Sequence, residues 1–175
     1  SCTAPTNEKD YSVFVNPFIG TGGHGHTFPG AVVPHGMIQP SPDTRIDGWD
    51  ACSGYYYEDS TINGFSHTHV SGTGCCDYGD VLLMPTVGEQ RYQTTDPQSQ
   101  QLAYSSAFSH ENETAEPGYY SVFLDTYQVK AEISATKRGA IHRYTFPESS
   151  EAGFILDLDY SLQRQTNSDM GIEVI

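Results

Sequence analysis

The chain has 175 residues and carries 8 basic against 22 acidic side chains, which gives a net charge of −14 with histidine neutral. This length fits one domain or a piece of a larger one. Only Lys9 and Arg45 are basic within the first ninety residues, so no positive surface can form there to bind nucleic acid or anionic lipid. Twelve tyrosines, eight phenylalanines and one tryptophan supply enough apolar surface for a folded core, which excludes a disordered acidic tail.

Residues 1–10 have no apolar periodicity, and we expect them to form a flexible leader or a lipoprotein tether. Ser1 and Cys2 resemble the junction of a bacterial lipoprotein signal, in which a small residue precedes the cysteine that is lipidated after cleavage. On this interpretation the protein is secreted, periplasmic or a cell-surface lipoprotein of a bacterium. No apolar run in the sequence is long enough to predict a transmembrane segment.

Residues 11–175 are predicted to form one domain. Between 11 and 42 the sequence is dense in glycine and proline, which favours short strands joined by shaped loops over helices. The glycines between 20 and 25 do not form a phosphate-binding loop, because the Gly-Lys-Ser/Thr ending is missing and no helical pattern follows.

Four strands are predicted in close succession, because apolar and polar residues alternate with the two-residue period of half-buried strands. They cover residues 120–124, 129–136, 140–146 and 154–159, with Glu116-Pro117-Gly118 and Lys137-Arg138-Gly139 as turn signals. In the last strand the period puts Phe154 and Leu156 on one face and Ile155 and Asp157 on the other. This spacing is typical of an all-β fold, an antiparallel β-sandwich.

The last residues, 171–175, are largely apolar and contain no turn or polar tail. A strand interrupted there would leave its neighbour with an unpaired edge. We therefore expect the β-sandwich to be incomplete at its C-terminus.

Two His-x-His pairs, His24 with His26 and His67 with His69, could offer paired imidazoles to a metal if they lay on strands. The sequence has neither the Cys-x-x-Cys spacing of structural zinc sites nor the His-Glu-x-x-His motif of zinc proteases. Hydrogen-bonded histidines in glycine-rich loops, or histidines that line a polar ligand pocket, are the alternatives.

Trp49, the single tryptophan of the chain, is flanked by Gly48 and Asp50. An aromatic ring beside a carboxylate suits sugars, because a pyranose stacks its C–H face on the ring and donates its hydroxyls to the carboxylate. Burial of Trp49 in the core is the alternative, although its flanking residues are polar and turn-like.

Glycoside hydrolysis requires a carboxylic acid and a carboxylate on either side of the scissile bond. Asp77 with Asp80, Glu111 with Glu113, and Asp157 with Asp159 are close in sequence, but such pairs are common in a chain with 22 acids. No Gly-x-Ser-x-Gly motif or catalytic Cys-His signature is present. The four cysteines allow three disulfide pairings or free thiols, and the sequence does not choose between them.

Several ungapped motifs within residues 11–150 resemble the start of the family 92 glycoside hydrolases. They are 16–31 (NPFIGTGGHGHTFPGA), 34–37 (PHGM), 41–44 (SPDT), 48–55 (GWDACSGY), 64–74 (GFSHTHVSGTG), 77–80 (DYGD), 109–115 (SHENETA) and 117–120 (PGYY).

This resemblance implies a calcium-dependent, inverting exo-α-mannosidase, often α-1,2-specific, which degrades N-glycans or mannan. It implies that the chain is an N-terminal β-sandwich domain joined to a larger (α/α)6 barrel that the chain lacks. The active site would lie between the two domains, with the general acid, the general base and the Ca²⁺ ligands on the barrel. No catalytic or metal-binding residue is therefore assigned here, and the isolated chain is expected to be inactive.

The resemblance also implies that Trp49 contacts the sugar on the leaving-group side, with Asp50 beside it. The full set of substrate-binding candidates is Trp49, Asp50, His24, Gly25, Phe28, His67 and His69. The predicted partners are an α-mannoside glycan and the enzyme's own barrel. A stand-alone carbohydrate-binding sandwich without catalysis is the second hypothesis, and a histidine-rich metalloenzyme is the third.

Overall fold

The computed structural model describes residues 9–93, 98–164 and 170–173 of the chain. Among these residues, the regular structure consists of ten strands and four short 3₁₀ helices. The strands are β1 (Ser41–Asp43), β2 (Thr61–Ile62), β3 (Gly64–Ser66), β4 (Leu82–Val87), β5 (Ser106–Ala107), β6 (Glu113–Glu116), β7 (Tyr119–Leu124), β8 (Val129–Ala135), β9 (Ala140–Thr145) and β10 (Ala152–Asp157). The helices are η1 (Ser12–Phe14), η2 (Trp49–Ala51), η3 (His110–Asn112) and η4 (Leu162–Arg164).

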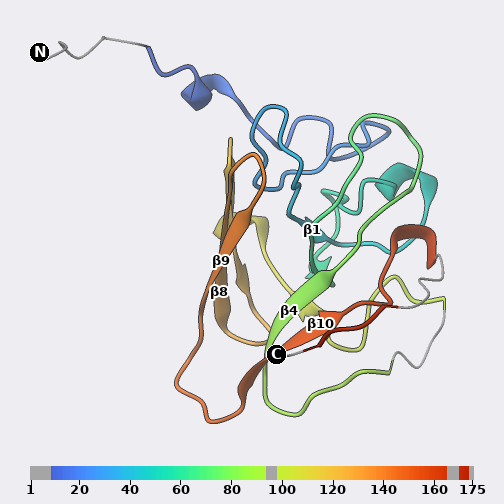
Figure 1. Ribbon diagram of the computed structural model, residues 1–175, viewed down its shortest axis with the longest axis vertical. Coiled ribbons are helices and arrows are strands. Elements are labelled where there is room, and N and C mark those ends of the chain that lie inside the picture. The colour runs from blue at the N-terminus through green and yellow to red at the C-terminus, as the bar shows by residue number, and fades with distance from the viewer. Residues whose placement is uncertain (1–8, 94–97, 165–169, 174–175) are drawn as a thin grey trace, which may run out of the picture.

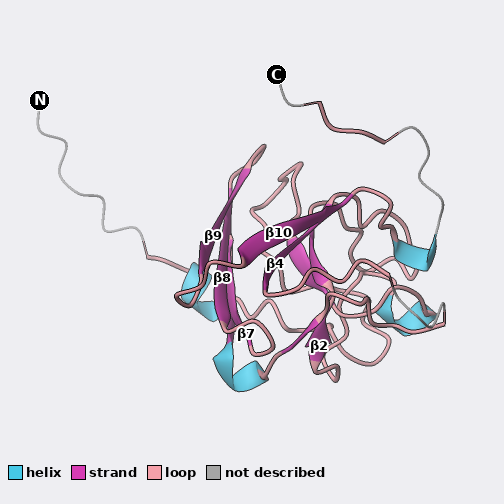
Figure 2. Ribbon diagram, turned by 90° about the horizontal axis from the view of Figure 1, so that it is seen from below, coloured by secondary structure: helices cyan, strands magenta, loops and turns pink. Residues whose placement is uncertain are grey.

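Two four-stranded antiparallel sheets form the body of the domain, one in the order β1-β3-β4-β10 and the other in the order β6-β7-β8-β9. A small pair, β2 with β5, stands beside them. Figures 1 and 2 show β8 and β9 in one layer and β4 and β10 in the other. One hydrophobic core lies between the sheets, and Phe65 from β3 contacts Tyr120 and Tyr144 across it. The predicted all-β fold is confirmed.

Strands β7 and β8, which were predicted from the alternation of apolar residues, form a regular antiparallel pair. In β7 and β8 the alternation buries one face of each strand, as predicted, and the pairing runs from Tyr119 opposite Ser134 to Leu124 opposite Val129. Gly118 joins β6 to β7 with a φ of +77°, a conformation that favours glycine in a tight turn. The other predicted turn lies between β8 and β9, where Thr136 N donates to Gly139 O.

Strand β10 was predicted correctly, but its core face is the opposite of the one its apolar residues suggest. Ile155 is buried, whereas Phe154 is 54% exposed and Leu156 is also exposed. The Phe154 ring still contacts Tyr144 of β9 and Phe146, with 5.3 and 5.5 Å between centroids, so this face of β10 is partly covered by the other sheet. Apolar residues occur on both faces of this strand, so alternation alone does not identify the inner face.

A buried carboxylate joins the second sheet to the loops around it. Glu113, at the start of β6, has a side chain that is only 1% exposed. It accepts hydrogen bonds from the hydroxyls of Tyr55 (3.0 Å) and Tyr120 (2.6 Å) and pairs with His110 Nδ1 at 2.6 Å. Burial first, and then the Glu113 carboxylate, raise the pKa of Tyr120, so its hydroxyl keeps the proton that it donates.

A line of hydrogen bonds also links the two layers. His67 follows β3, and its Nε2 lies 3.0 Å from Nε2 of His142 in β9, whose Nδ1 lies 2.8 Å from the Tyr144 hydroxyl. Because His67 Nδ1 donates to the carbonyl of Val81 at 2.7 Å, one neutral arrangement satisfies every atom: Tyr144 donates to His142, and His142 donates to His67. Burial, with a smaller contribution from His67, lowers the pKa of His142 to about 4.

Long loops before β4 cover one end of the sheets, in the upper half of Figure 1. The prediction of short strands within residues 11–42 is wrong except for the start of β1, because the described residues 11–40 contain turns and η1 but no strand. Close backbone approaches explain this: a Cβ on Gly30 would lie 2.1 Å from the carbonyl oxygen of Pro40. These loops carry the residues described in the next subsection.

Of the predicted leader, residues 1–10, the first eight lie outside the described residues, and Cys2 is among them. Residues 174 and 175 also lie outside. Among the described residues, none of the helices has the length and hydrophobicity that a membrane-spanning helix requires.

We predict that Glu113→Ala lowers the free energy of unfolding by about 2–5 kcal/mol, because two buried tyrosine hydroxyls lose their acceptor. Chemical denaturation of the purified chain measures this change. Glu116→Ala is the matched control, because Glu116 is exposed at the end of the same strand, and it should change stability by less than about 0.5 kcal/mol. Equal effects of the two substitutions would contradict the role given to Glu113.

The His67–His142 pair predicts a pH dependence of stability. His142 has a folded-state pKa of about 4 against an ordinary value of 6.5, so the unfolded chain binds more protons between these values. The stability of the pair is therefore complete above about pH 6.5 and is lost as the pH falls toward 4. Thermal unfolding at several pH values should show a shallower slope for His142→Gln than for the unchanged chain, and equal slopes would contradict the role given to this pair.

Candidate functional site

Trp49 begins the short helix η2 and lies on the surface. The preceding Gly48 has a φ of +108°, which turns the chain sharply into the helix. The Trp49 side chain is 58% exposed, so it is not a core residue. An exposed tryptophan in a polar turn presents an apolar face to solvent that a ligand can cover.

A hydrogen-bonded pair, His24 and Asp50, lies beside this ring. His24 Nδ1 is hydrogen-bonded to Asp50 Oδ1, and the two side chains come from separate loops. The His24 ring centroid lies 5.2 Å from that of Trp49. His24 Nε2 and Asp50 Oδ2 have no further partner among the described residues, so one nitrogen and one carboxylate oxygen remain free to bind hydroxyl groups.

His26 packs against the Trp49 ring and fixes its position. Its ring packs edge-on against the indole with 4.4 Å between centroids, and it is buried with a φ of +55°. Its carbonyl accepts a 2.6 Å hydrogen bond from Gly72 N, and a Cβ on Gly74 would lie 3.0 Å from His26 Nδ1 and 3.2 Å from Trp49 Nε1. The buried Nε2 of His26 has no hydrogen-bond partner within the described part of the chain. The 71–74 segment therefore fits against the His26–Trp49 pair only because residue 74 is glycine.

Gly25 gives the loop its shape rather than offering a side chain. A Cβ at this position would lie 2.1 Å from the carbonyl oxygen of Gly20, so any other residue would open the loop. Thr27 N donates to that same Gly20 oxygen at 3.3 Å. This closure places His24 and His26 together against Trp49.

Half-buried Phe28 packs against His69, which is buried beneath these loops. Their rings are 4.7 Å apart, and the His69 side chain is completely buried. His69 Nδ1 donates to the carbonyl of Gln39 at 2.7 Å, while Nε2 lies 2.8 Å from Asp43 Oδ1. Ser66 donates to the second Asp43 oxygen at 2.5 Å. This Asp–His–Ser cluster is enclosed in protein, so its role in the described structure is to hold β1, β3 and the loops together.

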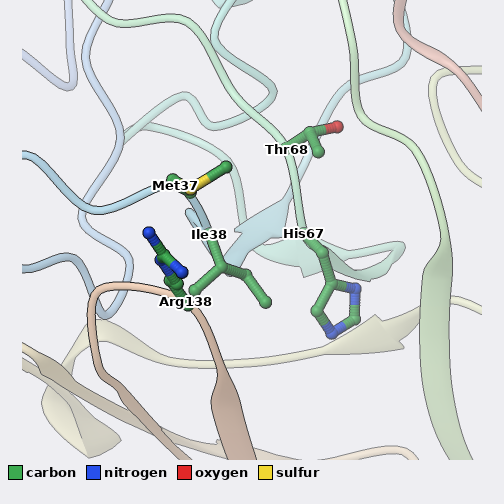
Figure 3. A pocket seen from close by; sticks show the side chains of 5 residues that line it. All are labelled: Met37, Ile38, His67, Thr68 and Arg138. Carbon is green, nitrogen blue, oxygen red and sulfur yellow. The ribbon is translucent and has the colours of Figure 1, made fainter.

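Unlike the enclosed His69, His67 lines an open pocket. It lies opposite Met37, Ile38 and Arg138, at the edge of an open pocket of about 550 Å³ (Figure 3). Its two ring nitrogens are engaged by Val81 and His142. The structure therefore brings Trp49, Asp50 and His24 together at one surface, supports them with Gly25, and places His67 and His69 elsewhere.

Neither His-x-His pair lies on a strand. The metal hypothesis assumed that a strand would place both imidazoles of a pair on one face, and this does not apply to either pair. Among the described residues there is no group of three or more His, Cys, Asp or Glu side chains that could hold a metal ion. Calcium in particular prefers six to eight oxygen ligands, and the Trp49 surface offers one carboxylate that is already bound to a histidine. The residues present do not fit a calcium site.

Cys52, Cys75 and Cys76 are free thiols in the structure. Cys52 is buried directly after η2, and burial, followed by the neighbouring Cys76, raises its pKa to about 12. A thiol with this pKa is a poor nucleophile at neutral pH.

In each acidic pair noted in the sequence, one carboxylate accepts a hydrogen bond from another side chain. Glu113 binds two tyrosines, Asp157 accepts from the Tyr104 hydroxyl, and Asp80 accepts from Thr68. The exposed ring, the adjacent carboxylate and the imidazole make a surface suited to a sugar, but one carboxylate cannot act as both acid and base in glycoside hydrolysis. The support by His26 and Gly74 was not predicted, although the glycines of the 64–74 motif were a signal for a close approach.

Comparison with protein families gives a match to the "Glycosyl hydrolase family 92 N-terminal domain" over residues 14–175. An uncharacterized secreted glycosidase of Arthroderma benhamiae is 31% identical over 154 residues, which are 86% of this chain and 19% of that protein.

Solved structures of relatives agree with this match. A family 92 α-mannosidase of Bacteroides thetaiotaomicron, solved alone and with mannoimidazole, is 44% identical with a TM-score of 0.81, covering 86% of this chain and 20% of that one. A family 92 inverting mannosidase of the same organism is 33% identical with a TM-score of 0.71, covering 87% and 20%. The chain spans about one fifth of the length of these relatives. With the family motifs in sequence and the fold in space both matched, this chain belongs to the N-terminal domain family of the family 92 glycosyl hydrolases.

Proposed function

We propose that the chain is the N-terminal domain of an inverting exo-α-mannosidase, and that its Trp49 surface contacts the sugar on the leaving-group side of the scissile bond. The exposed indole beside the His24–Asp50 pair is the observation that carries this proposal. Relatives that are named as mannosidases supply the substrate class.

Each group of this surface has a distinct role toward a pyranose. The Trp49 ring covers the apolar C–H face of the sugar and removes both surfaces from water. The free oxygen of Asp50 accepts from one hydroxyl, and His24 Nε2 accepts from another while Nδ1 remains paired with Asp50. Because His26 and Gly74 pack under the indole, its orientation is set before the sugar binds.

We place the general acid and the general base in the remaining part of the longer enzyme, on the barrel that the family resemblance implies. An inverting enzyme needs two carboxyl groups on opposite sides of the bond, far enough apart to admit a water molecule. This proposal places a single acid, Asp50, beside the indole, and one carboxyl group cannot serve as both the general acid and the general base.

The finer features of the enzyme are part of the same proposal. We assign α-1,2-linked mannosides of N-glycans or mannan as the substrate and Ca²⁺ as the cofactor, with the calcium ligands on the barrel. A secreted, periplasmic or cell-surface location is supported by the secreted relative. A stand-alone sugar-binding domain would use the same surface, but the greater length of the relatives favours the enzyme.

The first test is Trp49→Ala in the full-length enzyme. Loss of the stacking surface should cost about 1–3 kcal/mol of transition-state binding, or roughly 5- to 150-fold in kcat/KM for a mannose disaccharide. An activated aryl mannoside contacts the leaving-group side differently, so its hydrolysis should be affected much less. The exposed position of Trp49 predicts a nearly unchanged melting temperature.

Trp49→Phe is the matched control, because it keeps a smaller aromatic face and should retain part of the disaccharide activity. Equal losses on both substrates, together with a large drop in melting temperature, would refute the assignment of Trp49 as a sugar platform.

The second test uses the isolated 175-residue chain. We expect no release of mannose from disaccharide or aryl substrates with or without Ca²⁺, because the acid and base belong to the missing part of the enzyme. Hydrolysis that depends on Ca²⁺ would place the catalytic residues in this chain and overturn the division proposed here.

A further inference from the structure

A further pocket is lined in part by Thr21 and Gly22, which precede His24 in the same loop. This open pocket has a volume of about 360 Å³ and is lined by Asn16, Phe18, Thr21, Tyr57 and Glu58, among others. It contains two aromatic rings, a carboxylate and an amide. That set is chemically similar to the one around Trp49, although no residue is shared.

Tyr57 forms a rigid platform in this pocket. Its ring is stacked on His110, with 4.2 Å between centroids and 10° between planes, and Phe18 meets it edge-on at 5.9 Å. His110 is itself held by the buried carboxylate of Glu113 at 2.6 Å. Tyr57 nevertheless remains 42% exposed, so a fixed aromatic surface faces the pocket and solvent. A ring held in this way loses little conformational entropy when a ligand stacks on it.

The polar groups of the pocket match the hydroxyls of a sugar. Glu58 is exposed, and its carboxylate has no partner among the described residues. The Oδ1 of Asn16 accepts from Phe18 N at 3.0 Å, which leaves the Nδ2 amide group to donate. An aromatic plate with one acceptor and one donor can bind the apolar face and the polar edge of a hexopyranose together.

The loop between the two sites limits their separation. Tyr57 N donates to the carbonyl of Thr21 at 3.0 Å, and a Cβ on Gly22 would lie 3.6 Å from Tyr57 Cβ. Two residues later His24 contacts Trp49, and two residues of extended chain span at most about 7 Å. The Trp49 and Tyr57 surfaces are therefore close enough for a single oligosaccharide to reach both.

We propose that the Tyr57 pocket is a further sugar-binding subsite, which takes a hexopyranose unit of the glycan beyond the unit that stacks on Trp49. The inference rests on the proposed function of the Trp49 surface and extends it: the enzyme selects extended or branched glycans over disaccharides. Tyr57 supplies the stacking surface, and Glu58 and Asn16 bind hydroxyl groups. Phe18 and His110 position the Tyr57 ring.

The test compares Tyr57→Ala with the unchanged full-length enzyme on mannobiose and on a mannotetraose of the same linkage. We expect kcat/KM for mannotetraose to fall on the order of 3- to 10-fold, with little change for mannobiose. Tyr57→Phe should behave like the unchanged enzyme, because it keeps the ring. Tyr92→Ala, which removes another exposed tyrosine at a different pocket, should change neither substrate.

Equal losses on both substrates, or no loss on either, would overturn the inference. Calorimetric titration of a thio-linked mannotetraose, which glycosidases cleave very poorly, into the same variants gives a readout that does not depend on hydrolysis. If the unchanged enzyme binds the thio-linked sugar but hydrolyses neither mannobiose nor mannotetraose, the proposed function fails, whereas weaker binding by Tyr57→Ala still supports the subsite. Binding that Tyr57→Ala leaves unchanged, or an absence of binding, refutes the subsite.

Discussion

The buried carboxylate of Asp43 is the constraint on which the arrangement of the loops depends. It lies in β1 with no exposed side-chain surface and meets His69 at 2.8 Å and Ser66 at 2.5 Å. The two ring nitrogens of His69 face the carbonyl oxygen of Gln39 and the carboxylate of Asp43. Gly54 completes the enclosure, since a Cβ there would lie 2.1 Å from Asp43 Oδ1. If a loop moved away, the buried Asp43 carboxylate would lose a partner and remain uncompensated, which is energetically costly. The loops therefore have few alternative positions.

The geometry of the Trp49 surface follows from this constraint. Gly54 lies shortly after η2, and its carbonyl accepts from Thr44 N at 2.7 Å, so the turn that carries Trp49 is tied to the strand that carries Asp43. His69 also packs on Phe28, at the end of the loop whose earlier residues hold His24 and His26 against the indole. The sheets therefore act as a scaffold. The Asp43–His69–Ser66 cluster fixes loops without regular structure to these sheets and so holds them in place.

Sequence patterns predicted the parts of the structure in which local periodicity and packing agree. The two-residue period in β7 and β8 predicted both strands and their core faces, and in β8 one face is apolar and the other polar. For β10 the apolar residues lie on both faces, so only the strand could be predicted. The His-x-His pairs failed as strand pairs because they lie in loops, and the partner of His67 is His142, for which no local signal exists. The sequence left open whether Trp49 is buried or exposed, and its support by His26 depends on a positive φ that the sequence does not reveal.

A crystal structure of the full-length protein with an uncleavable mannose disaccharide is the most direct test of the central claim, that this domain contributes the sugar contact at Trp49. The account predicts that a pyranose ring lies in van der Waals contact with the indole and that its hydroxyls are hydrogen-bonded to Asp50 and His24. A structure in which the rest of the protein covers Trp49, with the disaccharide bound away from this domain, would contradict it.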